Sequence, residues 1–135
     1  MSANPEVRDL AGYGGVNVAH AAFGLVMPGL YGILILDLLG TISFCNSTFE
    51  SMTGGHSDDL LGRSVCDVLP DLPFSRKSPD YNRAMVTTKF GQDRWWPHRL
   101  ALASRGHCFV DVCIVPMVTD GRKRFVLEAR RTPSF

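Results

Sequence analysis

The chain has 135 residues, and its 14 Lys and Arg against 13 Asp and Glu give a formal net charge of +1. This length favours one domain built around one hydrophobic core. Apolar residues make up 45% and charged residues 20%, which is a globular balance rather than that of a disordered chain. A nearly neutral chain has no overall field that attracts nucleic acid or an anionic membrane, so we expect neither as a partner.

The cysteines and the N-terminus bear on where the protein works. The four cysteines are widely spaced and include no Cys-x-x-Cys pair, which argues against a disulfide framework and against a zinc site. The first residues have neither the basic nor the apolar stretch of a signal peptide. The longest apolar run, residues 30–36, is far shorter than the ~20 residues of a membrane span. We therefore expect a cytoplasmic protein that binds no metal.

The chain begins with a polar and then Gly-rich stretch over residues 1–16, which we expect to be a flexible lead-in. Residues 16–26 have apolar positions at helical spacing and predict a short helix that Pro28 ends. The apolar stripe of this helix consists of Val16, Ala19, Phe23 and Val26. We therefore assign residues 1–28 to a lead-in with an N-terminal cap helix and residues 29–132 to the folded domain.

Five segments rich in apolar and β-branched residues predict β-strands. They cover residues 31–37, 41–45, 98–104, 107–118 and 122–131. Turn residues stand between the first two strands at Leu39-Gly40, between the third and fourth at Arg105-Gly106, and between the last two at Asp120-Gly121. These short turns predict hairpins.

Helix-start signals fill the chain between the second and third strands. Asn46 and Ser47 can both cap a helix, and Ser47 with Glu50 has the spacing of a capping box, ahead of a helix that Gly54 ends. Ser57 predicts the cap of another short helix, which stops at Gly62.

A longer helix follows. Ser78, Pro79 and Asp80 supply a cap, a proline at the first helical position and an acid at the positive helix end, and the helix runs to about Lys89. The predicted order is therefore two strands, several helices and three strands.

This order and several short motifs together resemble the Per-Arnt-Sim (PAS) family. In that family the first two strands carry G-I-hydrophobic-hydrophobic-x-D-x-x-G-x-I, then come N-x-x-F and S-x-x-x-L-x-G-x-x-hydrophobic. The matching residues are Gly32 to Asp37, Gly40, Ile42, Asn46, Phe49, Gly54, Ser57, Leu61, Gly62 and Val65. The resemblance covers roughly residues 29 to 131. It implies an α+β fold: a five-stranded antiparallel sheet with short helices on one face and an N-terminal cap helix.

The resemblance also bears on cofactors. Some PAS domains hold haem through a His on the long helix, but residues 79–90 contain no His, and Lys77 lies near the expected place. The light-sensing flavin subgroup has a Cys directly after Gly-Arg-Asn, whereas Cys66 is displaced by one residue after Gly62-Arg63-Ser64. We therefore expect neither haem nor a covalent flavin.

A small molecule in such a domain would lie between the helix-covered face of the sheet and the long helix. We choose as candidate lining a set of large, mostly apolar residues with Tyr81 as its polar point. The set is Ile33, Ile35, Phe44, Phe49, Met52, Tyr81, Met85, Leu100, Leu102, Val112, Ile114 and Leu127. The same side chains would equally suit a packed core, so both interpretations stay open.

The long fourth strand has apolar residues on both faces. Val110, Val112 and Ile114 point to one side, and Asp111 marks the other side as the outer face. The apolar residues on that outer face are Phe109, Cys113, Val115 and Met117. An apolar outer face needs cover, so we expect these four residues and the stripe of the N-terminal helix to form a cap and a homodimer interface.

The remaining motifs point away from catalysis. No nucleophile, base and orienting group stand in a recognisable arrangement, so we do not expect an enzyme. Trp95, Trp96 and His98 predict either an aromatic wall for a planar ligand or, more simply, a lip packed on the helices.

We therefore expect a sensory or regulatory domain of a signalling protein. It would sense a small molecule or dimerise, and so control a linked kinase, cyclic-nucleotide enzyme or transcription regulator. The alternative is a ligand-free protein–protein interaction module that regulates an effector in cis.

Overall fold

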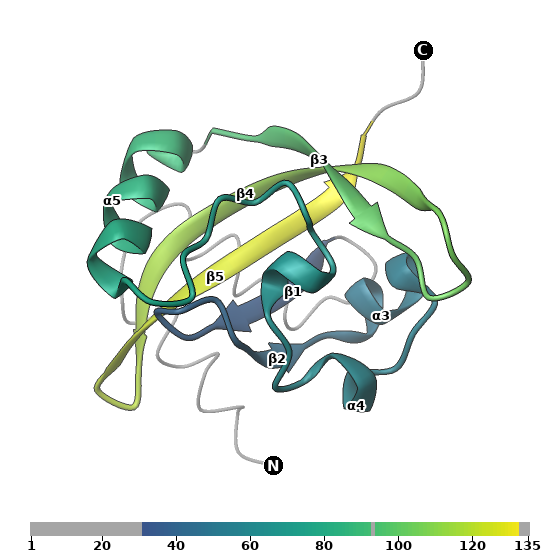
Figure 1. Ribbon diagram of the computed structural model, residues 1–135, viewed down its shortest axis with the longest axis horizontal. Coiled ribbons are helices and arrows are strands. Elements are labelled where there is room, and N and C mark those ends of the chain that lie inside the picture. Colours follow the sequence, from purple (N-terminus) through teal and green to yellow (C-terminus); the bar gives the residue numbers. More distant parts are fainter. Residues whose placement is uncertain (1–30, 93, 133–135) are drawn as a thin grey trace.

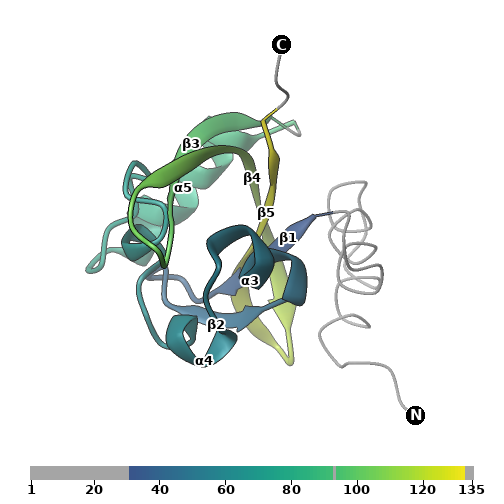
Figure 2. The same ribbon diagram turned by 90° about the vertical axis from the view of Figure 1, so that its right-hand side faces the viewer.

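The computed structural model describes residues 31–92 and 94–132, and the predicted lead-in and cap helix lie outside these ranges. The described chain forms the predicted five-stranded antiparallel sheet, and the order of its strands is β2-β1-β5-β4-β3 (Figure 1). Its strands are β1 (Gly32–Leu36), β2 (Ile42–Cys45), β3 (Trp96–Ala101), β4 (His107–Thr119) and β5 (Arg122–Arg131). The helices between β2 and β3 lie on one side of the sheet (Figure 2).

The first hairpin contains a β-bulge. Leu36 pairs with Ile42 while Ile35 pairs with Phe44, so Ser43 is an extra residue in β2. The turn is held by the Asp37 carboxylate, which accepts hydrogen bonds from the backbone amides of Leu39 and Thr41, both at 2.9 Å. The bulge changes which face each β2 side chain occupies.

Helix α3 (Ser47–Thr53) is capped by Asn46, one of the two predicted cap residues. The Asn46 carboxamide accepts hydrogen bonds from the amides of Phe49 and Ile33, each at 2.9 Å, and so joins the helix start to β1. The carboxylate of Glu50 accepts instead from the amide of Ser57. The predicted capping box of Ser47 and Glu50 is therefore wrong, because Asn46 takes the cap position and the Glu50 carboxylate binds Ser57.

Two short helical turns follow α3. Helix α4 (Ser57–Leu60) has His56 at its cap position without a side-chain hydrogen bond, so Ser57 is its first helical residue and not its cap. The 3-10 turn η1 (Val65–Asp67) is capped by Ser64, whose hydroxyl accepts from the amide of Cys66 at 3.2 Å. These turns bring Leu60 and Val65 into the core.

Helix α5 (Pro79–Phe90) is the longest helix of the described chain, and it starts at Ser78 as predicted. Asn82, Val86 and Phe90 are buried at a spacing of four residues, so this line of the helix faces the sheet.

The Asn82 side chain ties the N-terminal half of α5 to two other segments. Its amide nitrogen donates to the carbonyls of Leu38 and Ser75, each at 2.8 Å. Its oxygen accepts from the amide of Ser75 at 2.7 Å. Since Asn82 is fully buried, these bonds replace water that cannot reach it.

The last three strands form two hairpins. Strand β3 covers 96–101 instead of the predicted 98–104, and beyond Ala101 the amide of Ala103 donates to the Thr53 carbonyl rather than to β4. The turn between β4 and β5 has positive φ at Asp120 (49°) and Gly121 (74°), as the predicted two-residue turn requires.

The sheet buries apolar side chains on both faces. The helix-covered face carries the larger cluster, which includes Leu34, Leu36, Ile114 and Leu127. The opposite face carries a second, smaller cluster of buried residues: Ile33, Ile35, Cys113, Val115, Met117 and Val126. The predicted division of β4 between the two faces is therefore confirmed.

We predict that Asn82→Ala destabilises the domain by about 1–3 kcal/mol, because it leaves three partly buried backbone groups without their partner. Urea unfolding measures this loss. The control is Thr88→Ala, on the exposed side of the same helix, which should change the unfolding free energy by no more than about 0.5 kcal/mol. Equal effects of the two substitutions would contradict the role given to Asn82.

Candidate functional site

Seven of the twelve candidate lining residues come together on the helix-covered face. They are Phe49, Met52, Leu100, Val112, Ile114 and Leu127, with Met85 packed against them from α5. They belong to one cluster with other buried side chains such as Leu69 and Phe90, which were not among the predicted lining residues. The chain's own side chains thus pack where the predicted pocket was placed, and a ligand at these positions stays a prediction.

Five candidates lie elsewhere and are corrected. Ile33 and Ile35 belong to the opposite face, since Gly32, Leu34 and Leu36 take the inner positions of β1.

Phe44 also packs on the opposite face, because the bulge at Ser43 shifts the alternation of β2. Tyr81 is 51% exposed, because Asn82, one residue further along the helix, takes the inward position. Leu102 is half-buried and lines a separate hollow with Thr53 and Arg63.

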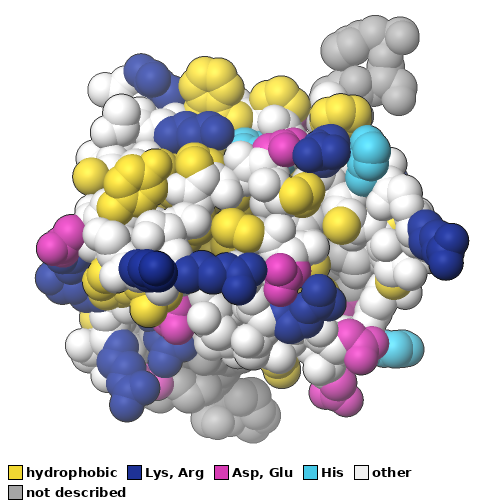
Figure 3. All heavy atoms as spheres, viewed as in Figure 1, with side chains coloured by type: hydrophobic (Ala, Val, Ile, Leu, Met, Phe, Trp, Pro, Cys, Tyr) yellow, Lys and Arg dark blue, Asp and Glu magenta, His cyan; other side chains and the backbone are white. Residues whose placement is uncertain are grey.

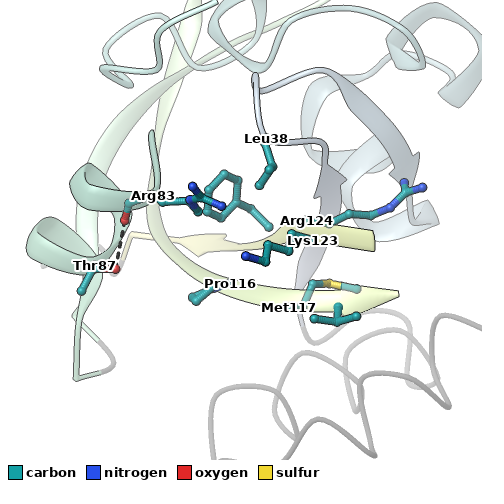
Figure 4. Close-up of a pocket in the computed structure, with 9 residues that line it drawn as sticks. Leu38, Arg83, Thr87, Pro116, Met117, Lys123 and Arg124 are labelled. Atoms are coloured by element: carbon teal, nitrogen blue, oxygen red, sulfur yellow. Dashed lines mark hydrogen bonds between the residues drawn. The ribbon is translucent and has the colours of Figure 1, made fainter. Parts of the chain in front are cut away.

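The candidate site that the geometry offers is a groove between α5 and the β4–β5 hairpin, with a volume of about 270 Å³ (Figure 4). Its lining comes from three parts of the fold: the turn after β1, one side of α5, and the hairpin. The lining residues are Leu38, Arg83, Thr87, Pro116, Met117, Val118, Lys123, Arg124 and Phe125. We call this the hairpin groove.

The inner face of the hairpin forms the apolar wall of the hairpin groove. Pro116 pairs with Phe125 and Val118 with Lys123, so these four residues share one face of the hairpin with Ile114 and Leu127. Phe125 is fully buried and stacks edge-on against Phe74, with ring centroids 5.6 Å apart. A molecule in the groove would therefore touch the edge of the core.

Two cations face this wall. Figure 4 shows the charged ends of Arg83 and Lys123 pointing toward one another across the groove, while Arg124 points away. Arg124 donates from Nη1 to the Ser43 hydroxyl at 2.9 Å. Arg83 pairs with the exposed carboxylate of Asp80. The groove thus combines an apolar wall with positive charge.

Another hollow lies on the other side of α5. It is shallow and lined by Tyr81, Ala84, Met85, Thr88 and Lys89. Figure 3 shows hydrophobic side chains gathered on the side of the molecule where α5 lies. This hollow offers an apolar surface but no opposing wall.

His98 is the one histidine of the described residues that is buried. Its Nδ1 lies 3.0 Å from the Trp96 carbonyl and its Nε2 lies 3.3 Å from Lys89 Nζ. A carbonyl accepts and an ammonium donates, so this arrangement fits a neutral ring with the proton on Nδ1. Burial lowers the pKa of His98, and the charge of Lys89 lowers it further, against the raising effects of the Trp96 carbonyl and Asp71.

The two tryptophans do not form one aromatic wall. Trp95 packs with the cluster on the outer face, beside Tyr31 and under the guanidinium of Arg130, which lies 4.0 Å from its ring centroid. Trp96 is exposed and donates from Nε1 to the Lys89 carbonyl at 2.7 Å. Trp96 therefore contacts α5, as the predicted lip requires, whereas Trp95 packs on the outer face of the sheet and not on the helices.

Only four of the eight predicted interface residues lie within the described part of the chain. Cys113, Val115 and Met117 are buried in the outer cluster, whereas Phe109 is 57% exposed. Val16, Ala19, Phe23 and Val26 lie outside the described residues, so their predicted packing and the homodimer stay predictions.

In residues 31–92 and 94–132 no group of three His, Cys, Asp or Glu side chains is placed to hold a metal. None of the helices in those ranges has the length and hydropathy for crossing a bilayer.

Burial raises the pKa of the Cys45 thiol to about 12, with a smaller contribution from Glu50. Cys45 is therefore protonated at neutral pH.

Comparison with known proteins agrees with this geometry. The family model described as the PAS fold matches residues 31–133. The PAS domain of an HTR-like protein from Haloarcula marismortui has a similar structure, with a TM-score of 0.64 and 19% identity over 86% of this chain and 98% of that one. A search of curated proteins finds no significant match.

Two further solved structures are similar. The PAS domain from a two-component sensor histidine kinase has a TM-score of 0.64 and 14% identity, over 82% of this chain and 93% of that one. The PAS domain of nitrogen regulation protein NR(II) from Vibrio parahaemolyticus has a TM-score of 0.57 and 14% identity, over 84% of this chain and 98% of that one.

We predict that stability falls as the pH drops through about 6.5, because the pKa of His98 is lower in the folded than in the unfolded state. The unfolded chain then binds the proton that the folded chain excludes, so stability is retained above this pH and lost below it. Urea unfolding between about pH 7.5 and about pH 5 measures the loss. It should be smaller in His98→Gln and unchanged in His107→Gln, an exposed position; identical pH profiles for all three proteins would contradict this.

Proposed function

Because the chain belongs to the PAS-fold family, we propose that it is a sensory or regulatory domain that binds a small molecule and controls an attached effector. Similar PAS domains come from a two-component sensor histidine kinase and from the nitrogen regulation protein NR(II). A kinase, a cyclic-nucleotide enzyme or a transcription regulator would suit the role of effector. In this proposal the domain regulates chemistry and does not carry it out.

The observation that carries the proposal is the hairpin groove. It is concave, has an apolar wall with a few polar groups, and opens between two separate elements, which are features of small-molecule sites. The packed core beneath α5 leaves the groove as the better candidate for the binding place. At about 270 Å³ it suits a compact ligand.

A ligand in the hairpin groove would contact elements that reach other parts of the domain. Thr87 is adjacent in sequence to Val86, which packs in the core, and Arg83 is adjacent to the Asn82 amide. On the other wall, Phe125 pairs with Leu36 of β1 across the sheet. If the domain has two conformations that differ in the arrangement of α5 and the hairpin, a ligand that binds one of them more tightly would increase the population of that conformation.

The alternative proposal is a ligand-free interaction module that acts on an effector in cis. It is favoured by the same packed core, which suits a domain that holds no ligand there. The apolar outer face and the predicted homodimer belong to this alternative as well as to the first. The two proposals differ in whether any small molecule binds.

We predict that a thermal-shift screen of the intact chain against small metabolites finds ligands that raise its melting temperature. At ten times its Kd a ligand adds about 1.4 kcal/mol, which corresponds to several degrees for a domain of this size. Thr87→Trp should abolish the shift, because the indole fills the hairpin groove.

The matched control is Thr88→Trp, which places the same side chain in the shallow hollow on the other side of α5 and should keep the shift. If no metabolite raises the melting temperature, the interaction module replaces the sensory domain as the proposed function. If Thr87→Trp responds like the wild type, a sensory role remains but its site is not the groove.

A further inference from the structure

We propose that the hairpin groove binds a small organic acid, with its carboxylate between Arg83 and Lys123 and a compact apolar body against Phe125 and Leu38. The inference rests on the proposed function and names the class of ligand that the same site would take. It follows from the charge, the wall and the size of the groove.

The charge comes from two cations on opposite walls. Arg83 stands on α5 and Lys123 on β5, and their charged ends point toward one another (Figure 4). The Lys123 ammonium has no ion pair or hydrogen bond with any other described residue. Two like charges that face each other repel, and an anion bound between them would offset this repulsion because it attracts both.

Arg83 retains donors for such an anion. Its contact with Asp80 uses Nη2, and a guanidinium carries five N–H donors in one plane. Asp80 is also largely exposed, with 83% of its side chain accessible, so water competes for it. A carboxylate held by Arg83 and Lys123 inside the groove would be better shielded, and charge-assisted bonds of this kind are the strong ones.

No acidic side chain among the lining residues opposes an anion, since the lining consists of basic, hydroxyl and apolar residues. Asp37 precedes the lining residue Leu38 in the sequence, but its carboxylate already accepts hydrogen bonds from two backbone amides of the turn. The groove therefore favours an anion over a cation.

The apolar wall and the volume of the groove indicate the chemical character and the size of the rest of the ligand. Leu38, Pro116, Val118 and Phe125 present an apolar surface that a bare inorganic anion would leave exposed to water. The volume of about 270 Å³ equals that of about nine water molecules in the liquid. A carboxylate with a single ring or a short branched chain has this size.

The test uses benzoate as a probe on the ¹⁵N-labelled intact chain, followed by amide chemical shifts. Benzamide keeps the ring and removes the charge, and acetate keeps the charge and removes the ring. We expect saturable shifts from benzoate at the amides of Leu38, Arg83, Thr87 and Phe125, with binding about ten-fold weaker or more for both comparison molecules.

The charge is tested by a matched pair of variants on one strand. Lys123→Gln and Arg122→Gln each remove one positive charge from β5, but Lys123 lines the groove and Arg122 does not. Lys123→Gln should weaken benzoate binding about three-fold or more, and Arg122→Gln should leave it unchanged. Arg83→Gln should act like Lys123→Gln.

Three results would overturn the proposal: no saturable shift from benzoate, equal binding of benzoate and benzamide, or equal binding by the Lys123→Gln and Arg122→Gln proteins. Acetate that binds as tightly as benzoate would overturn the apolar part. Since the titration tests only this ligand class, its failure leaves the sensory role to the metabolite screen, in which neutral ligands of the groove would still appear.

Discussion

One buried amide sets the position of the longest helix. The Asn82 side chain makes three hydrogen bonds, to Leu38 after β1 and to both backbone groups of Ser75. These bonds fix the rotation of α5 about its axis, because Asn82 must point inward. With Asn82, Val86 and Phe90 facing the sheet, Arg83 and Thr87 necessarily line the hairpin groove, and Tyr81 faces solvent.

The sheet explains why the groove lies at the hairpin end. Strand β3 pairs with β4 only as far as Val112, so residues 113–119 of β4 have β5 as their hydrogen-bonded neighbour on one side. Pro116, which has no amide hydrogen to donate, is tolerated on such an edge. Beneath the centre of α5 large side chains close the space, and toward the hairpin end the two layers separate.

The fold followed from local signals, whereas the site needed information from other segments. The caps, turns and apolar runs predicted every strand and the α5 helix, and β4 was divided correctly because Asp111 stands on its outer face. Strand β1 is apolar on both faces, so nothing in its pattern shows that Leu34 rather than Ile35 points inward.

Asn82 was missed as a buried position for a related reason. An Asn on a helix resembles a surface residue until its partners, Leu38 and Ser75, are placed beside it. The hairpin groove likewise combines Leu38, Arg83 and Lys123 from distant parts of the sequence, and none of the three belongs to a motif.

The central claim is that a ligand acts in the hairpin groove, between α5 and the β4–β5 hairpin. Amide hydrogen exchange with and without saturating benzoate tests it most directly. A ligand in the groove should slow amide exchange in Pro79–Phe90 and in residues 113–126, with little change in β2 and α3. Exchange that does not change in α5 and the hairpin, or that slows equally throughout the domain, would contradict it.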